Sequence, residues 1–214
     1  MTAVILAGGK SRRVGENKAF LNWGHQTLIA HSVALLSPLF KDLLIVASRE
    51  NVKALTELFP LYPRIVTDAV KDKGPLGGIH AGLVSARSFA AFVIGCDMPL
   101  LSPNLISFLK SLIAGYDAVV PRTPMGCEPL HTIYTKNCLS VIEEQLCGFD
   151  LRPNDIFPRL NVRYVEPEEM MAFDPELLSF ANINSLEDYR NLALRFARGD
   201  GRGHSVRARC GSDE

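Results

Sequence analysis

Residues 2–21 read Thr2-Ala-Val-Ile-Leu-Ala-Gly-Gly-Lys-Ser-Arg-Arg-Val-Gly-Glu-Asn-Lys-Ala-Phe-Leu21. The short apolar run over residues 3–7 predicts a buried first strand of a parallel sheet. The glycine pair after it, Gly8-Gly9, lets the backbone turn sharply and come close to a ligand. The cations that follow, together with the free N–H groups of such a loop, suit a polyanion such as a triphosphate. The alternative is an ordinary strand-to-helix turn with solvated basic side chains.

The chain of 214 residues is long enough for one sizeable α/β domain or two small ones. Its 23 basic and 23 acidic side chains balance, which argues against nucleic-acid and acidic-membrane partners. No apolar run approaches the roughly 20 residues of a membrane helix, and no signal-type segment precedes the first strand. We therefore expect a cytoplasmic protein. Because the net charge is zero, any anion site must be formed by a local group of basic side chains.

Strand-like and helix-like segments alternate, which is typical of an α/β fold with a mainly parallel sheet. Further strands are predicted over residues 42–47, 64–67, 90–95, 117–121, 128–135, 162–165 and 180–184. Helices are predicted over residues 27–37, 50–59, 79–87, 104–114, 136–146, 154–160 and 185–197. Pro129 places its strand at an edge or a bulge. We expect a single domain over residues 1–198 and a flexible tail over residues 199–214.

Candidate site residues follow two of the predicted strands. In open α/β sheets, ligands bind just outside the carboxyl ends of the strands, where both Gly8-Gly9 and Asp97 are expected. A lone carboxylate such as Asp97 is a good Mg²⁺ ligand when a nucleotide phosphate supplies further oxygens. Its alternative role is to cap the turn that follows. Lys18, beside a triphosphate, would neutralise charge on the leaving group.

Two other segments allow a functional and a structural interpretation. Residues 72–78 are predicted to form a glycine loop before a helix, but Gly74-Pro-Leu-Gly-Gly78 matches neither the Walker A nor the dinucleotide pattern. Close packing of backbone on backbone is its structural interpretation. Asn182 and Asn184 would point the same way on an extended segment and hold a polar ligand or a metal-bound water. Turn formation before a helix is the alternative for this pair.

The five cysteines are widely spaced and include no C-x-x-C pair, which argues against a disulfide framework and a structural zinc site. Cys96 stands beside Asp97, so nucleophilic catalysis has to be considered. A catalytic cysteine needs a partner base and an electropositive setting, whereas a neighbouring acid raises the thiol pKa. No triad-like context surrounds His31, His80, His131 or His204. Covalent catalysis is therefore disfavoured.

Five motifs, in order between residue 5 and about residue 195, resemble those of the molybdenum cofactor guanylyltransferases, the MobA family. They are Leu6–Lys18 (L-A-G-G-K-S-R-R-V-G-E-N-K), Gly74–Leu83 (G-P-L-G-G-I-H-A-G-L), Cys96–Leu100 (C-D-M-P-L), Glu128–Tyr134 (E-P-L-H-T-I-Y) and Phe180–Asp188 (F-A-N-I-N-S-L-E-D). The resemblance implies a Rossmann-like nucleotidyltransferase domain. That fold is a three-layer α/β/α arrangement with a mostly parallel sheet.

The same resemblance implies an activity and its partners. The activity is transfer of GMP from Mg·GTP to the terminal phosphate of molybdenum-bearing molybdopterin, with release of pyrophosphate. GTP, molybdenum-molybdopterin and Mg²⁺ are the implied ligands. Molybdoenzymes or their chaperones are candidate protein partners for the product.

The resemblance also assigns roles to residues. The nucleoside would be held by Leu6, Ala7, Gly8, Gly9 and Asp68. The triphosphate would face Arg13 and Lys18, and Mg²⁺ would bind Asp97. The acceptor or metal side would be formed by Asn182 and Asn184.

Departures from the family pattern keep two alternatives open. Asn17 stands where Asp is usual, and Ser48 stands where related chains often carry a nucleoside-contacting Asn. These changes allow a nucleotide-binding scaffold without chemistry, although the presence of Lys18 and Asp97 favours an enzyme. The other alternative is a molybdenum cofactor cytidylyltransferase or another small-molecule nucleotidyltransferase. Gly8 favours GTP, because the cytidylyl enzymes read L-A-A-G in the first loop.

Overall fold

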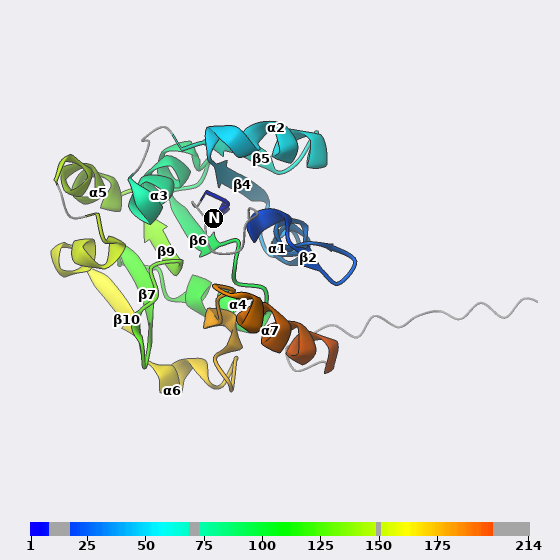
Figure 1. The fold of residues 1–214 in the computed structure, drawn as a ribbon. Coiled ribbons are helices and arrows are strands. Elements are labelled where there is room, and N and C mark those ends of the chain that lie inside the picture. The colour runs from blue at the N-terminus through cyan, green and yellow to red at the C-terminus, as the bar shows by residue number, and fades with distance from the viewer. Residues whose placement is uncertain (9–17, 69–72, 149–150, 199–214) are drawn as a thin grey trace, which may run out of the picture.

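The computed structural model describes residues 1–8, 18–68, 73–148 and 151–198 (Figure 1). The central sheet contains β1 (Thr2–Leu6), β4 (Asp42–Ala47), β5 (Arg64–Thr67), β6 (Ala90–Gly95), β7 (Ala118–Thr123), β8 (Gly126–Cys127), β9 (His131–Thr135) and β10 (Val162–Val165). A separate hairpin pairs β2 (Asn22–Trp23) with β3 (Gln26–Thr27). The α-helices are α1 (Leu28–Leu36), α2 (Arg49–Leu58), α3 (Gly74–Ser85), α4 (Pro103–Ser111), α5 (Cys138–Cys147), α6 (Pro167–Met170) and α7 (Leu186–Arg198). Short 3-10 helices are η1 (Lys18–Phe20), η2 (Pro153–Arg159) and η3 (Leu178–Phe180).

The strand order of the sheet is β10-β7-β9-β6-β1-β4-β5, with β8 paired to β7. The chain moves outward from β1 to β4 and β5, and then returns to β6 on the other side of β1. On the main path, β9 is antiparallel to both of its neighbours, and the other pairs are parallel. The reversal of strand order at β1 creates a topological switch point, where ligands bind at the carboxyl ends of strands.

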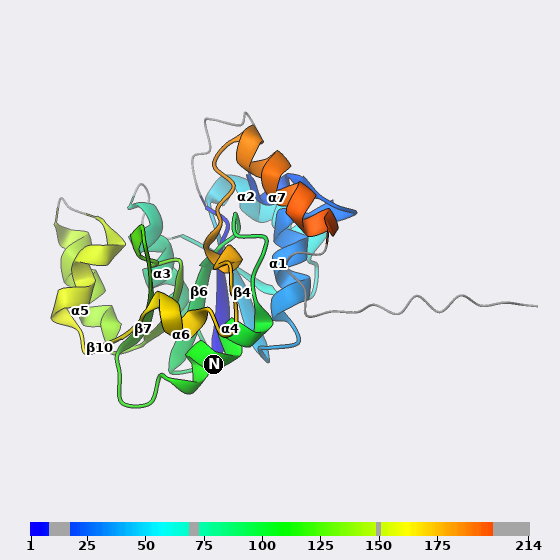
Figure 2. The ribbon, with the colours of Figure 1, turned by 90° about the horizontal axis from the view of Figure 1, so that it is seen from below.

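Helices cover both faces of this sheet. One hydrophobic core contains buried residues of α1, α2 and α4, and the core on the other face contains residues of α3 and α5. Figures 1 and 2 show α3 and α5 on one side of β6 and β4, and α1 on the other. The residues of β1 are buried throughout, because both faces of this strand are covered. The predicted three-layer fold class, with its mostly parallel sheet, is confirmed.

Side-chain caps explain where two of the helices begin. Thr27 caps α1 by accepting a hydrogen bond from the Ala30 amide, and Ser102 caps α4 in the same way from the Leu105 amide. Most of the predicted strands and helices are confirmed within a few residues. The β2–β3 hairpin was missed, although Gly24, with a φ of 63°, is the kind of residue that such a turn requires.

The predicted glycine loop over residues 72–78 is wrong from Gly74 onward, because Gly74 begins α3. The glycines allow the helix to lie directly on β1. A Cβ atom on Gly82 would lie 2.5 Å from Cγ1 of Val4, and one on Gly78 would lie 3.2 Å from Cδ1 of Leu6. Close helix–strand packing therefore explains these two glycines.

Two predicted strands also differ from the structure. The strand around Pro129 is not at an edge, because β9 begins after the proline and lies between β6 and β7. The segment 181–184 is not a strand. Instead, the Ile183 amide donates to the carbonyl oxygen of Asp97 at 2.9 Å, which holds this irregular segment beside the end of β6.

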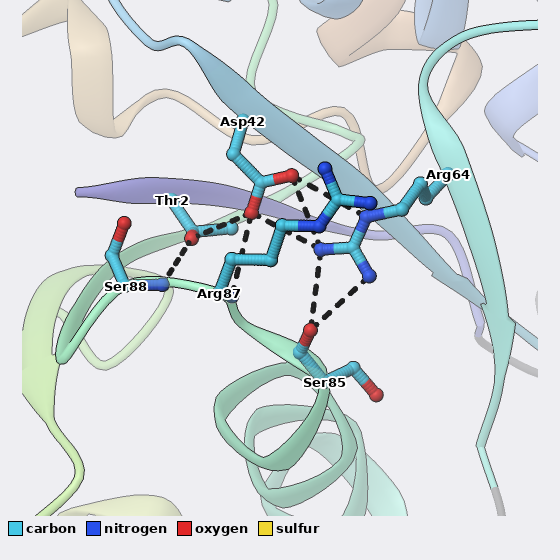
Figure 3. A network of polar contacts seen from close by, with 6 residues as sticks. All are labelled: Thr2, Asp42, Arg64, Ser85, Arg87 and Ser88. Atoms are coloured by element: carbon cyan, nitrogen blue, oxygen red, sulfur yellow. Dashed lines mark hydrogen bonds and ion pairs between the residues drawn. The ribbon is translucent and has the colours of Figure 1, made fainter.

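A polar network ties the amino ends of the strands together, at the sheet edge opposite to the carboxyl ends (Figure 3). It contains Thr2, Asp42, Arg64, Ser85, Arg87 and Ser88. The Asp42 carboxylate accepts from Thr2 Oγ1 at 2.8 Å and from Arg64 Nη2 at 3.1 Å. Burial alone would raise the pKa of Asp42, but the bonds from Thr2 and Arg64 and the Arg64 charge lower the pKa below its usual value.

Other predictions concern the extent of the domain and of the tail. The single domain over residues 1–198 stays a prediction, and the predicted tail over residues 199–214 lies outside the described residues. Within the ranges that the structure describes, no helix is both long and apolar enough to cross a membrane.

Candidate active site

The carboxyl ends of β1, β4, β5 and β6 meet at one edge, because these strands are parallel. Backbone hydrogen bonds continue the ladder beyond the strands. The Ala7 amide donates to Val46, the Cys96 amide donates to Leu6, and the Asp68 amide donates to Ala47. The segments that follow these strands are therefore held side by side at the switch point next to β1.

Lys18 joins three distant parts of the chain at this edge. Its ammonium nitrogen lies 3.2 Å from Oδ2 of Asp97 and 3.0 Å from Oδ1 of Asn184. Lys18 comes from η1, Asp97 from the turn after β6, and Asn184 from the segment before α7. The Lys18 and Asp97 side chains are 17% and 24% exposed, so the pair is sheltered and still accessible. The structure thus brings together three residues that sequence motifs had indicated separately.

Glycine makes room for the Asp97 carboxylate. A Cβ atom on Gly95 would lie 2.6 Å from Oδ1 of Asp97, so a side chain at this position would displace the carboxylate. The same Cβ would lie 3.6 Å from Cδ1 of Leu130, the residue before β9. The absence of a side chain at Gly95 therefore lets the carboxylate fold back over the end of β6.

Asn184 is held by the start of α7. The amides of Asn184 and Ser185 both donate to Oδ2 of Asp188, at 2.9 and 2.8 Å. The Asp188 amide donates in return to Oγ of Ser185. The bond from the Asn184 amide is the largest contribution that lowers the pKa of Asp188, followed by the Ser185 hydroxyl, with a smaller contribution from the Lys18 charge. This reciprocal cap fixes the backbone from which the Asn184 side chain reaches Lys18.

The oxygens around Lys18 fit Mg²⁺. A carboxylate from Asp97 and an amide oxygen from Asn184 are hard ligands, and both already face one cationic group. No group of three or more His, Cys, Asp or Glu side chains within the described residues could hold a metal. A Mg²⁺ ion at Asp97 would therefore take further oxygens from a bound phosphate or from water, as is usual for this ion.

The residues predicted to hold the nucleoside occupy different environments. Leu6 and Ala7 are buried, and the Leu6 side chain packs against α3 at Gly78. Gly8 is exposed and lies close to the backbone of Ser48 at the end of β4, since a Cβ there would be 3.5 Å from the Ser48 amide nitrogen. Among the described residues of this loop, Gly8 is therefore the one open to a ligand.

Asp68 lies at the same edge, beyond β5. Both of its carboxylate oxygens would be 3.4 Å from a Cβ on Gly77, so the side chain lies against the start of α3. Asn182 is half-buried, and Asn184 rather than Asn182 accepts from Lys18. Gly9, Arg13 and Asn17 lie outside the described residues.

Cys96 is buried beside Asp97. Burial, followed by the Asp97 charge, raises the pKa of its thiol to about 12, although the nearby Lys18 charge acts in the opposite direction. The thiol is therefore protonated at neutral pH, and a protonated thiol is a poor nucleophile. This agrees with the sequence-based argument against covalent catalysis.

A small third core supports the site, and sequence reasoning missed it. Its buried members are Trp23, Leu28, Leu100, Ile183 and Leu192. Trp23 is close in sequence to Lys18, Leu100 to Asp97, and Ile183 to Asn184. The signal was present in the sequence, because a large apolar residue lies one to five positions from each of these three polar residues.

Comparisons with known proteins show the family of this chain. The family model described as MobA-like NTP transferase domain matches residues 3–154. A probable molybdenum cofactor guanylyltransferase of Pelotomaculum thermopropionicum is 35% identical, over 87% of this chain and 89% of the relative. The molybdenum cofactor guanylyltransferase of Desulfosudis oleivorans is 36% identical, over 88% of this chain and 92% of the relative.

A solved structure gives the same result. The crystal structure of molybdopterin-guanine dinucleotide biosynthesis protein A from Archaeoglobus fulgidus is similar to this chain with a TM-score of 0.81 and 28% sequence identity. The match covers 92% of this chain and 100% of that one. The resemblance drawn from the five motifs is confirmed. The chain belongs to the family of MobA-like NTP transferase domains.

Proposed function

We propose that this enzyme transfers GMP from Mg·GTP to the terminal phosphate of molybdenum-bearing molybdopterin. The products are pyrophosphate and the guanine dinucleotide form of the cofactor. The names of the relatives in Pelotomaculum and Desulfosudis support this reaction. The structural observation that carries the proposal is the contact of Lys18 with both Asp97 and Asn184 at the switch point of the sheet.

The chemistry requires little from a general base. The acceptor is a phosphate monoester, so its oxygen is already a nucleophile at neutral pH. That oxygen attacks the α-phosphorus of GTP, and the bond from this phosphorus to the oxygen bridging to the β-phosphate breaks. The electron pair leaves with pyrophosphate. Catalysis then depends on in-line positioning and on neutralising the charge that develops on the phosphates.

The roles of the side chains follow from this requirement. Lys18 neutralises charge on the triphosphate, and its ammonium is oriented beforehand by Asp97 and Asn184. Asp97, with Asn184 beside it, would hold Mg²⁺, which supplies Lewis-acid polarisation of the phosphate oxygens when bound. Asn182 serves the acceptor side. Arg13 is proposed to face the triphosphate together with Lys18.

We assign the binding of the nucleoside part of GTP to the residues that follow β1 and β5. Gly8 and Gly9 approach the nucleoside through the backbone, and the Asp68 carboxylate contacts it from the end of β5. Leu6 and Ala7 are buried, so their role is to hold the backbone that leads to Gly8. Delivery of the product to molybdoenzymes or their chaperones, and the cytoplasmic location of the reaction, stay predictions.

The test is pyrophosphate release by the purified full-length chain with Mg²⁺, molybdenum-molybdopterin and either GTP or CTP. We expect release with GTP and none with CTP. Asp97→Ala should abolish release and keep the thermal unfolding transition of the wild type. Release with CTP alone would overturn the choice of nucleotide, and GTP binding without any release would favour the scaffold alternative.

A further inference from the structure

The turn that carries Asp97 is anchored by a histidine of α1. Nε2 of His31 lies 2.8 Å from the carbonyl oxygen of Pro99, two residues after Asp97. Because a carbonyl oxygen can only accept, Nε2 carries the hydrogen and donates it. In the neutral ring Nδ1 is then an acceptor, and it faces Nε2 of the Gln26 side chain at 3.4 Å. Both ring nitrogens therefore have a partner that suits one tautomer.

Aromatic side chains hold the His31 ring in place. The ring centroid lies 6.2 Å from that of Trp23 and 5.4 Å from that of Phe196, to which it is nearly perpendicular. Trp23 also contacts Phe196 and Tyr189, and the Tyr189 hydroxyl donates to the carbonyl oxygen of Asn22. The histidine ring is thus held between the β2–β3 hairpin and α7. Burial lowers the pKa of His31, although the hydrogen bond to Pro99 acts in the opposite direction. The lowered pKa favours the neutral ring at neutral pH.

The small core around Trp23 contains residues that are close in sequence to each of the three polar residues of the site. Trp23, Leu100 and Ile183 pack in one small core and follow or precede Lys18, Asp97 and Asn184 by only a few residues. That core includes Leu28 of α1, the first residue of the helix that carries His31. Apolar packing brings these segments together but has little directional preference. The bond from His31 to Pro99 is directional, so it can set the rotation of the turn.

We propose that His31 is a positioning residue of the transfer site, which fixes the turn bearing Asp97 against Lys18 through its hydrogen bond to Pro99. His31 acts on the site through the Pro99 backbone and does not itself touch the reacting groups. The activity part of its test rests on the proposed GMP transfer. The structural part does not depend on that function.

Two variants separate the hydrogen bond from the packing. His31→Gln keeps a donor at nearly the position of Nε2, whereas His31→Leu has a similar volume and no donor. Phe196→Leu is the matched control, because it removes a ring that packs on His31 and leaves the Pro99 bond. If His31→Leu does not fold, His31→Asn replaces it, since its shorter amide does not reach Pro99.

Steady-state kinetics are the first measurement. We expect His31→Leu to lower kcat and to raise the Mg²⁺ concentration for half-maximal rate by about 10-fold to 100-fold, as is usual for residues that orient a metal ligand. His31→Gln should restore most of both values. Phe196→Leu should lower the melting temperature without moving the Mg²⁺ dependence. Equal impairment of His31→Leu and His31→Gln, or a shifted Mg²⁺ dependence in Phe196→Leu, would reduce His31 to a packing role.

Crystal structures of the wild type and of both His31 variants are the second measurement, and they require no activity. The distance from Lys18 Nζ to Asp97 Oδ2 should stay near 3.2 Å in the wild type and in His31→Gln. It should lengthen beyond contact in His31→Leu. An unchanged distance in His31→Leu overturns the proposal. A wild type without GMP transfer would instead overturn the proposed function, and the structures would still decide the role of His31.

Discussion

The ammonium nitrogen of Lys18 lies 3.2 Å from Oδ2 of Asp97, although 79 positions of the sequence separate the two residues. The same nitrogen donates to Asn184, which lies 166 positions further along the chain than Lys18. A ligand that enters this edge of the sheet therefore meets a cation and a carboxylate that are already oriented. Groups oriented in advance need no reorganisation during the reaction, which is the main source of electrostatic catalysis.

Lys18→Met tests this arrangement. The methionine keeps the length of the side chain and removes the charge, so kcat/KM for GTP should fall by about 100-fold to 1,000-fold, the usual loss for one electrostatic contact to a transition state. The free energy of unfolding should change by less than about 1 kcal/mol, because partly exposed ion pairs contribute little to stability. Pyrophosphate release and urea unfolding measure the two effects.

The matched control for this variant is Lys53→Met, which removes an exposed lysine from α2. It should keep the wild-type rate. Wild-type kcat/KM in Lys18→Met would contradict the role of the ammonium group in charge neutralisation.

The Cys96 thiol should be chemically inert in the folded protein. With its pKa raised to about 12, the thiolate fraction at pH 8 is about 10⁻⁴. Iodoacetamide at this pH should modify the exposed Cys147 and leave Cys96 intact, which peptide mass spectrometry would show. Cys96→Ala should retain GMP transfer. Rapid alkylation of Cys96, or loss of turnover in Cys96→Ala, would reopen a covalent mechanism.

Gly82→Ala should destabilise the fold, even though alanine favours helices more than glycine does. The new Cβ would lie 2.5 Å from Cγ1 of Val4, and relief of such a clash typically costs about 1–3 kcal/mol. Val4→Ala removes the atoms that clash. The double variant should therefore lose less stability than the sum of the two single variants in urea unfolding. Additive losses would show that α3 moves away from β1 at little cost.

His131 should make the protein less stable as the pH falls. The ring is fully buried, neither nitrogen has a hydrogen-bond partner within the described residues, and burial lowers its pKa to about 3. The pKa of the unfolded side chain is about 6.5. Between these two values the unfolded chain binds one more proton than the folded chain. The free energy of unfolding should therefore fall with decreasing pH, by up to about 1.4 kcal/mol per pH unit.

His131→Leu should flatten this dependence between pH 6.5 and pH 4 in urea unfolding. It should also raise stability at pH 7, because it removes two buried polar atoms that lack partners. His25→Gln is the matched control, since His25 is exposed, and it should leave the slope unchanged. An unchanged slope in His131→Leu would show that other groups produce the acid sensitivity.

Several features were predictable from the sequence because they depend on neighbours along the chain. Continuous apolar runs identified β1, β4 and β6, since strands covered on both faces carry no polar side to break the pattern. The start of α4 is likewise local, because Ser102 accepts a hydrogen bond from an amide three residues away. The five motifs identified the family, and they placed Lys18, Asp97 and Asn184 among the candidate site residues.

Other features depend on distances between parts of the chain that no local pattern records. The sequence of Gly74–Gly78 is compatible with a loop, but these residues form the start of α3, and Gly78 packs against Leu6 of β1. Likewise, β9 lies inside the sheet because both β6 and β7 pair with it, despite Pro129 just before it. The sequence by itself thus determined the fold class, the family and the candidate residues. The tertiary structure decided that Asp97 and Asn184 share one ammonium group and that His31 anchors the turn, because hydrogen bonds over such separations exist only once the sheet and its third core have assembled.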